Sequence, residues 1–201
     1  CSHLSQFKEF ISTTSAGGSG RLFETDLSPL LSVVSVTVFP DADQPGAKYA
    51  AQVMAYCMIN EIPVSVLDIS AMGWVDGQDA ADFPDISWSE YESYLINTDD
   101  WVSLSPWHRK LFDEAVMLVA AQMTPVDYDR VKTHIADVLG IGKRILDGEV
   151  KKLRKVAVET EIIDEPEMSP EALEAYRESI YDDISHIAEA KDILSEVIIF
   201  G

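Results

Sequence analysis

The sequence is poor in cysteine, in basic residues and in long apolar runs. Its two cysteines, Cys1 and Cys57, match neither a disulfide framework nor the spacing of a zinc site. No run of about 18 apolar residues occurs, so no membrane-spanning helix is expected. The first residues also lack the basic and apolar regions of a signal peptide. We therefore expect a protein of the reducing cytoplasm without a membrane partner, in which Cys57 is buried as a small hydrophobic residue.

Basic residues are scarce and unevenly distributed. The chain has 201 residues, with 15 Lys and Arg, 35 Asp and Glu, and a formal net charge of −20. This charge argues against nonspecific binding to duplex DNA, which needs clustered cations. Residues 1–97 carry 3 basic and 13 acidic side chains, residues 98–155 carry 10 and 9, and residues 156–201 carry 2 and 13. We predict an α/β domain, a helical module, and an acidic linker with a C-terminal helix over these three ranges.

Apolar and β-branched residues predict parallel strands in the first region. Residues 9–14, 33–39 and 64–69 have strand composition, and a helix is expected between the last two, over residues 45–60. The run 33–39 is apolar almost throughout, as in a central strand that is covered on both faces. A strand, a helix and a strand of this length predict a right-handed crossover with parallel pairing.

The second region has the periodicity of helices. The spacing of apolar residues predicts three of them, and the breaks between them contain Pro125 and Gly140. An acidic, proline-containing loop is expected before a last helix that begins at Ser169. The predicted helices span residues 104–122, 126–139, 140–155 and 169–195.

Four aspartates follow two successive predicted strands. Asp41 and Asp43 come after the first of these strands, and Asp79 and Asp82 lie in the loop after the second. The carboxyl ends of parallel strands are where open α/β sheets bind ligands. Mg²⁺ prefers carboxylate oxygens together with waters and substrate phosphates, so a metal here could assist displacement at phosphorus. The same residues also suit turns and helix caps, and the pattern alone leaves both interpretations open.

Other polar and aromatic residues give weaker signals. His108 stands apart from cysteines and other histidines, so we expect a surface or core histidine rather than a metal ligand. The tryptophans are expected to pack where the first two regions meet, with base stacking as the alternative. The stripe of Lys and Arg over residues 143–155 is either a solvated helix face or a nucleic-acid contact.

The order of the acidic motifs resembles the Toprim domain of phage and plasmid-type DNA primases. That family shows a strand, a pDxDxpG turn, a helix, a second strand and a GxDaaD loop. Here the turn is Pro40–Gly46 and the loop is Gly77–Asp82. The segment Thr13–Gly20 is similar to the Thr/Ser-Gly-Gly segment of the same family. The following helices are similar to the part between Toprim and helicase, so the resemblance covers about residues 9–155.

The resemblance implies metal-dependent nucleotidyl transfer, namely the synthesis of RNA primers in DNA replication. Asp41 and Asp43 would ligate Mg²⁺ or Mn²⁺, and Asp79 and Asp82 would support that ion or bind a second one. Nucleotides and single-stranded DNA would be the ligands, and a replicative helicase part or partner would act beside the domain. The residues expected to contact nucleotide or nucleic acid are Lys48, Lys143, Arg144, Lys151 and Lys152.

One part of the Toprim pattern has no counterpart in the sequence. The family carries an acid/base Glu in an EGE-like motif at the end of its first strand, whereas Cys1–Phe7 contains no acid. We expect either a fragment that starts after that strand, as the missing initiator Met also suggests, or an inactive homologue. The alternative function is therefore a noncatalytic acidic module, which binds a basic partner or mimics DNA to occupy a replication or defence protein.

Overall fold

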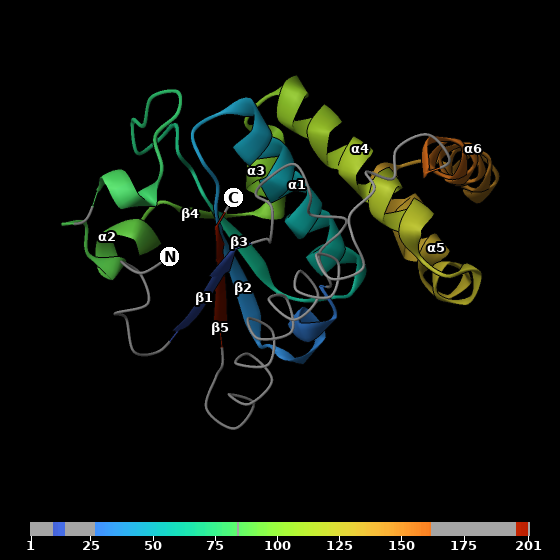
Figure 1. The fold of residues 1–201 in the computed structure, drawn as a ribbon, viewed down its shortest axis with the longest axis horizontal. Coiled ribbons are helices and arrows are strands. Elements are labelled where there is room, and N and C mark those ends of the chain that lie inside the picture. Colours follow the sequence, from blue (N-terminus) through green and yellow to red (C-terminus); the bar gives the residue numbers. More distant parts are fainter. Residues whose placement is uncertain (1–9, 15–26, 84, 162–195, 201) are drawn as a thin grey trace, which may run out of the picture.

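A five-stranded sheet with helices on both faces organises the molecule (Figure 1). The computed structural model describes residues 10–14, 27–83, 85–161 and 196–200. The spatial order of the strands is β1-β5-β2-β3-β4, in which β1, β5, β2 and β3 are mutually parallel and β4 is antiparallel to β3. The protein is thus of the mixed α/β class, as predicted. The strands are β1 (Phe10–Thr14), β2 (Ser35–Phe39), β3 (Val64–Leu67), β4 (Leu95–Asn97) and β5 (Glu196–Phe200).

The central position of β2 explains its apolar sequence. Val36 and Val38 join a large hydrophobic cluster on one face of the sheet, and Phe39 joins a smaller cluster with Leu67 and Tyr91 on the other. Even the polar Thr37 is only 1% exposed. The predicted strand covered on both faces is therefore confirmed, although it begins two residues later than the apolar run.

The first helix, α1 (Gln44–Ile59), connects β2 to β3 as predicted. Pro45 occupies its first turn, where the missing N–H costs nothing. Its buried residues include Tyr49, Met54 and Cys57. Cys57 is fully buried, as expected for a small hydrophobic residue, and burial raises the pKa of its thiol to about 12.

The helices of the second region pack on α1. These are α3 (Thr98–Ser103), α4 (Pro106–Gln122), α5 (Pro125–Leu139) and α6 (Lys143–Glu161). Side chains of α1 and α4 belong to one continuous cluster, so residues 98–155 share a core with the sheet. Thr124 caps α5 at its start, and Gly140 ends it with a positive φ of 64°, which glycine adopts without strain. The three predicted long helices are confirmed to within a few residues.

A short helix, α2 (Trp88–Glu92), covers the other side of the sheet, and the short strand β4 forms one of its edges. The helix begins at Ser87, whose hydroxyl oxygen accepts a hydrogen bond from the backbone N–H of Glu90. This cap fixes the start of the short helix. In the part of the chain that the structure describes, no helix is both long and apolar enough to cross a membrane. The expected last helix over residues 169–195 and most of the glycine segment Thr13–Gly20 lie outside the described residues.

Candidate acidic site at the carboxyl edge of the sheet

The structure brings the two acidic segments together at one edge of the sheet. The backbone N–H of Ala42, which follows β2, donates to the carbonyl of Gln78 over 2.7 Å, and the N–H of Gly77 donates back to the Ala42 carbonyl over 3.1 Å. These two bonds attach the loop after β3 to the turn after β2. Asp41 and Asp79 are close enough for their charges to interact. The carboxyl ends of neighbouring parallel strands thus meet, as the sequence predicted.

Three of the four candidate ligands also cap backbone N–H groups. Asp43 is the N-cap of α1, and its Oδ1 accepts from the N–H of Gly46 over 2.6 Å. Asp79 and Asp82 form a reciprocal capping box around the 3-10 helix η4 (Ala80–Asp82), with distances of 2.6 and 3.1 Å. Each cap uses one carboxylate oxygen. The interpretation of Asp43, Asp79 and Asp82 as turn and cap residues is therefore confirmed. The second oxygen of each carboxylate can still bind a metal.

Asp41 differs from the other three. No residue in the described ranges donates a hydrogen bond to its carboxylate or forms an ion pair with it. Burial, together with the smaller effects of the neighbouring charges of Asp79 and Asp43, raises the pKa of Asp41 to about 6. The carboxylate thus lies in an environment that disfavours its negative charge. A cation at this position would relieve the repulsion.

The close approach of α1 holds Asp41 in place. A Cβ atom added to Gly46 would lie 2.4 Å from the carbonyl oxygen of Asp41 and 2.7 Å from its backbone nitrogen. Only glycine therefore lets the first turn of the helix lie against this part of the backbone. The turn Pro40–Gly46 of this chain ends in glycine for this physical reason.

The arrangement suits a metal with few protein ligands. Across the described residues, no group of three or more His, Cys, Asp or Glu side chains is placed to hold a metal ion. A closed site of the structural zinc kind is therefore not built there. Mg²⁺ is commonly bound through one or two carboxylates, with waters and substrate phosphates completing its shell. Asp41 with Asp43 or Asp79 fits that requirement, so magnesium or manganese binding stays a prediction.

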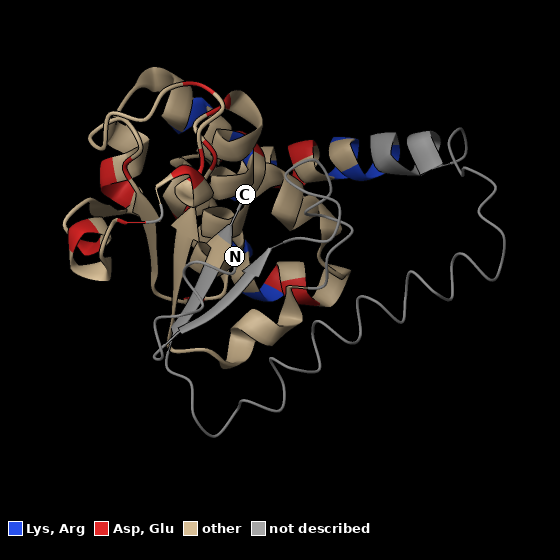
Figure 2. Cartoon of the chain, turned by 60° about the vertical axis from the view of Figure 1, so that its left-hand side comes forward, with Lys and Arg blue, Asp and Glu red and all other residues tan. Residues whose placement is uncertain are grey.

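The predicted cationic contacts do not gather at this edge. Lys48 is exposed on α1, one turn after Asp43. Lys143, Arg144, Lys151 and Lys152 are exposed on α6, at the opposite end of the molecule from the loop with Asp79 (Figures 1 and 2). Lys152 is paired with Glu149 at 2.5 Å. A role for the α6 residues in contacting nucleic acid stays a prediction, and it concerns a separate surface.

A small cavity beside Asp43 is lined by residues that the sequence analysis did not place together at one site. It has a volume of about 270 Å³ and lies between the strand ends and the start of α4. His108 lines it, and its Nδ1 lies 2.8 Å from the hydroxyl of Ser105, the N-cap of α4. Burial lowers the pKa of His108, while Asp68 acts in the opposite direction. The sequence signal that could have indicated this contact is a serine at a helix N-cap, Ser105, three residues before His108.

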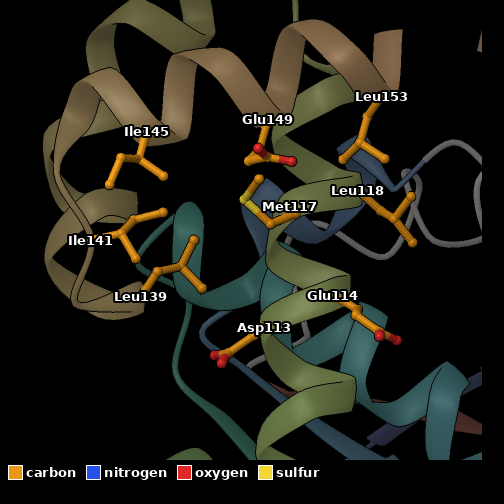
Figure 3. A pocket seen from close by; sticks show the side chains of 9 residues that line it. All are labelled: Asp113, Glu114, Met117, Leu118, Leu139, Ile141, Ile145, Glu149 and Leu153. Carbon is orange, nitrogen blue, oxygen red and sulfur yellow. The ribbon is translucent and has the colours of Figure 1, made fainter. Parts of the chain in front are cut away.

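A larger cavity lies elsewhere, in the helical module (Figure 3). It is a groove of about 590 Å³ between α4 and the segment that runs from the end of α5 into α6. Met117, Leu118 and Leu153 extend into it, and Ile145 is 60% exposed at its edge. Its acidic residues are Asp113, Glu114 and Glu149. Chemically the groove offers apolar contact, not a reaction centre.

Comparison of the chain with protein-family models, with curated proteins and with solved structures gave no match. The function is therefore argued from the site itself. The Toprim resemblance stays a prediction from the sequence.

The unusual environment of Asp41 predicts a pH-dependent stability. Its pKa is higher in the folded protein (about 6) than its ordinary value of 3.8, so the folded state binds this proton more tightly. The stabilisation is fully present below about pH 4 and is lost as the pH rises through 6. Because Asp41 is partly exposed, we expect a loss of about 1 kcal/mol rather than the full shift.

This expectation is tested by urea unfolding of the wild-type protein and of Asp41→Asn, in EDTA, at about pH 4 and pH 7. The variant should be more stable than wild type at the higher pH and equal to it at the lower one. Asp137→Asn on α5 removes one exposed charge elsewhere and should show no such difference. Equal effects of the two variants at pH 7 would contradict the assignment.

Proposed function

We propose that this protein binds Mg²⁺ or Mn²⁺ at the sheet edge that carries Asp41, Asp43, Asp79 and Asp82, here called the acidic edge. In this proposal it takes part in nucleotidyl transfer during DNA replication, as a Toprim-type primase. The observation that carries the proposal is Asp41, a partly buried carboxylate without a partner among the described residues and with two acidic neighbours. A partly buried carboxylate beside two others is unfavourable when it is charged, and a bound cation would offset that repulsion. The motif order of the sequence supports the same assignment.

Each residue of the acidic edge would have its own role in binding the metal or the substrate. Asp41 would lose its proton on binding and supply one oxygen, and Asp43 and Asp79 would add the oxygens that their caps do not use. When bound, the metal would neutralise phosphate charge and stabilise the displacement at phosphorus. Lys48, exposed on α1, would approach the phosphates from the helix side. No residue is assigned as the acid/base, so the proposal concerns metal and substrate binding.

Single-stranded DNA and a helicase complete the proposed context. The exposed cations of α6 would contact the DNA backbone, where each contact adds salt-dependent affinity. These cations lie on a surface separate from the acidic edge (Figures 1 and 2), so the bound DNA would extend from α6 toward the metal. A helicase part or partner would supply the unwound strand.

Mn²⁺ binding, followed by electron paramagnetic resonance, tests the metal site. Asp41→Asn and Asp43→Asn should each lower the affinity at least about tenfold, because even indirect supports of a metal site contribute about 10- to 100-fold. Asn remains a good N-cap, so Asp43→Asn keeps the start of α1. Asp137→Asn, which likewise removes one negative charge, is the control for weak binding to the acidic surface. Unchanged affinity in both site variants would sink the proposal.

A second function, a noncatalytic interaction module, is favoured by a different observation. The groove of Figure 3 exposes apolar side chains between acidic ones, and the chain as a whole carries a net charge of −20. This suits an amphipathic helix with basic flanks, presented by a replication or defence protein. The Mn²⁺ experiment separates the two functions, because this one needs no metal site.

A further inference from the structure

The cavity beside Asp43 has the lining of a ligand site. It is bordered by the turn after β2, by the segment after β3 and by the beginning of α4. At about 270 Å³ it is at the lower end of the range for small-molecule pockets, about 300–1,000 Å³. It therefore has room for one planar ring system and not for a whole nucleoside triphosphate.

Aromatic and apolar side chains form one wall of the cavity. Trp107 is 40% exposed and Leu104 is 43% exposed, although both are large hydrophobic residues. Trp101 is buried, and its ring meets that of His108 edge-on at 4.5 Å. The ring of Trp107 meets His108 at 5.0 Å in the same manner. His108 is thus fixed between two indoles, and the exposed indole offers a surface on which a base can stack.

The polar side chains that line the cavity are three carboxylates, one imidazole, the amide of Gln44 and the hydroxyl of Ser70. Asp43, Asp68 and Asp76 line it, and no Lys or Arg is among the described residues that do. Asp68 uses Oδ1 to accept from the N–H groups of Ser70 and Ala71, so its second oxygen can face a ligand. Ser105 engages Nδ1 of His108, and no described residue bonds to Nε2. Such a lining repels a phosphate and suits a neutral ring that carries N–H donors.

We propose that this cavity is a nucleobase subsite, in which the base stacks on Trp107 and its exocyclic amino group donates to Asp68 or Asp76. The inference rests on the proposed function, because Asp43 borders both the cavity and the acidic edge. A nucleotide would place its base here and its phosphates beside Asp41, on the other side of the first turn of α1. Bases with an exocyclic amino group, such as adenine and cytosine, are preferred over uracil, which has none, since carboxylates accept from such groups.

Indole signals in nuclear magnetic resonance spectra provide the test. Adenosine, cytidine and uridine are titrated into the ¹⁵N-labelled full chain in EDTA, so that neither a metal nor a phosphate contributes. The Nε1 signals of Trp101 and Trp107 should shift, more strongly with adenosine and cytidine than with uridine. Trp74, stacked on Phe83, and Trp88 belong to the smaller cluster, and their signals should stay in place. Absence of shifts, or equal shifts of all four signals, overturns the inference.

Two variants sharpen the test. Trp107→Ala should weaken adenosine binding by roughly tenfold, within the range for loss of one stacking partner. Asp68→Asn keeps the Oδ1 acceptor of the turn but replaces the other oxygen by a donor, so it should weaken adenosine and cytidine and leave uridine unchanged. Spermidine is the competing probe: shifts caused by spermidine and not by nucleosides would identify a cation site instead.

The result of the nucleoside titration can be distinguished from the result of the Mn²⁺ experiment. Nucleoside binding without Mn²⁺ binding would support the subsite and reject the metal site. Mn²⁺ binding that depends on Asp41, with unmoved signals of Trp101 and Trp107, would reject the subsite alone.

Discussion

Replacing Gly46 by alanine is expected to destabilise the protein by about 1–3 kcal/mol, although the same change normally stabilises a helix. Alanine is favoured over glycine in a helix interior by about 1 kcal/mol. At this position, however, the new Cβ would lie 2.4 and 2.7 Å from backbone atoms of Asp41, which cannot rotate away as a side chain can. Overpacking of this kind costs about 1–3 kcal/mol or more. Urea unfolding followed by circular dichroism measures the difference.

The matched control is Gly148→Ala in α6. Nothing lies within 4 Å of a Cβ atom at Gly148, so the ordinary helix preference should apply there. We expect a gain of about 0.5–1 kcal/mol. Opposite signs for the two substitutions would establish the close approach at Asp41. A stabilising Gly46→Ala would show that the turn and the helix are not packed together in this way.

Arg154→Ala should lower the free energy of unfolding by about 2–4 kcal/mol. Its guanidinium, on α6, donates to three carbonyl oxygens at the end of α4, at distances of 2.8 to 3.3 Å. The last four carbonyls of a helix have no partner within it. Hydrogen bonds to charged groups contribute about 1.5–3 kcal/mol each. The guanidinium also lies over the ring of Tyr128, 5.4 Å from its centroid.

Two further variants make this expectation specific. Arg154→Lys should recover only part of the loss, because an ammonium cannot match several acceptors with a planar fork. Lys152→Ala, which removes an exposed pair with Glu149 on the same helix, should change stability by no more than about 0.5 kcal/mol. Chemical denaturation of the three variants decides the matter, and a small effect of Arg154→Ala would contradict the capping role.

Arg154 also illustrates a limit of reading charge from sequence. It belongs to the basic stripe over residues 143–155, in which a cation on a solvated face cannot be told apart from one that binds carbonyls of another helix. The distinction depends on α4, which is more than 30 residues away in the chain. Lys143, Arg144, Lys151 and Lys152, by contrast, are exposed and remain available to nucleic acid.

The β2–α1–β3 unit could be predicted because local signals agreed there. The apolar run, the Asp43 cap with Pro45, and the periodicity of the helix all indicate the same crossover. The short strand β4 carried no such signal, since three residues of mixed polarity are not distinctive. It forms because Asn97, Ile96 and Leu95 pair with β3. Its existence is a tertiary effect.

The candidate site was predictable in its acids and not in its surroundings. Asp41, Asp43 and Asp79 follow strands, and strand ends meet at one edge of a parallel sheet. The motif could not show that the carboxylates of Asp79 and Asp82 accept hydrogen bonds from backbone N–H groups of η4 and its N-cap, nor that Asp41 is the carboxylate with the raised pKa. The cavity was missed because His108 and Trp107 reach it from α4, which sequence periodicity describes only as a helix.

The place of β5 in the sheet has a consequence for synthesis of the chain. β5, residues 196–200, lies between β1 and β2 and pairs with both. On the ribosome, β1 emerges long before β5, the strand with which it pairs in the described part of the chain. The unit β2–α1–β3 and the helices packed on it can form before β5 has been made. The pairing of β1 with β5 therefore forms only after synthesis of the long segment between them, and such late, long-range pairing is slow.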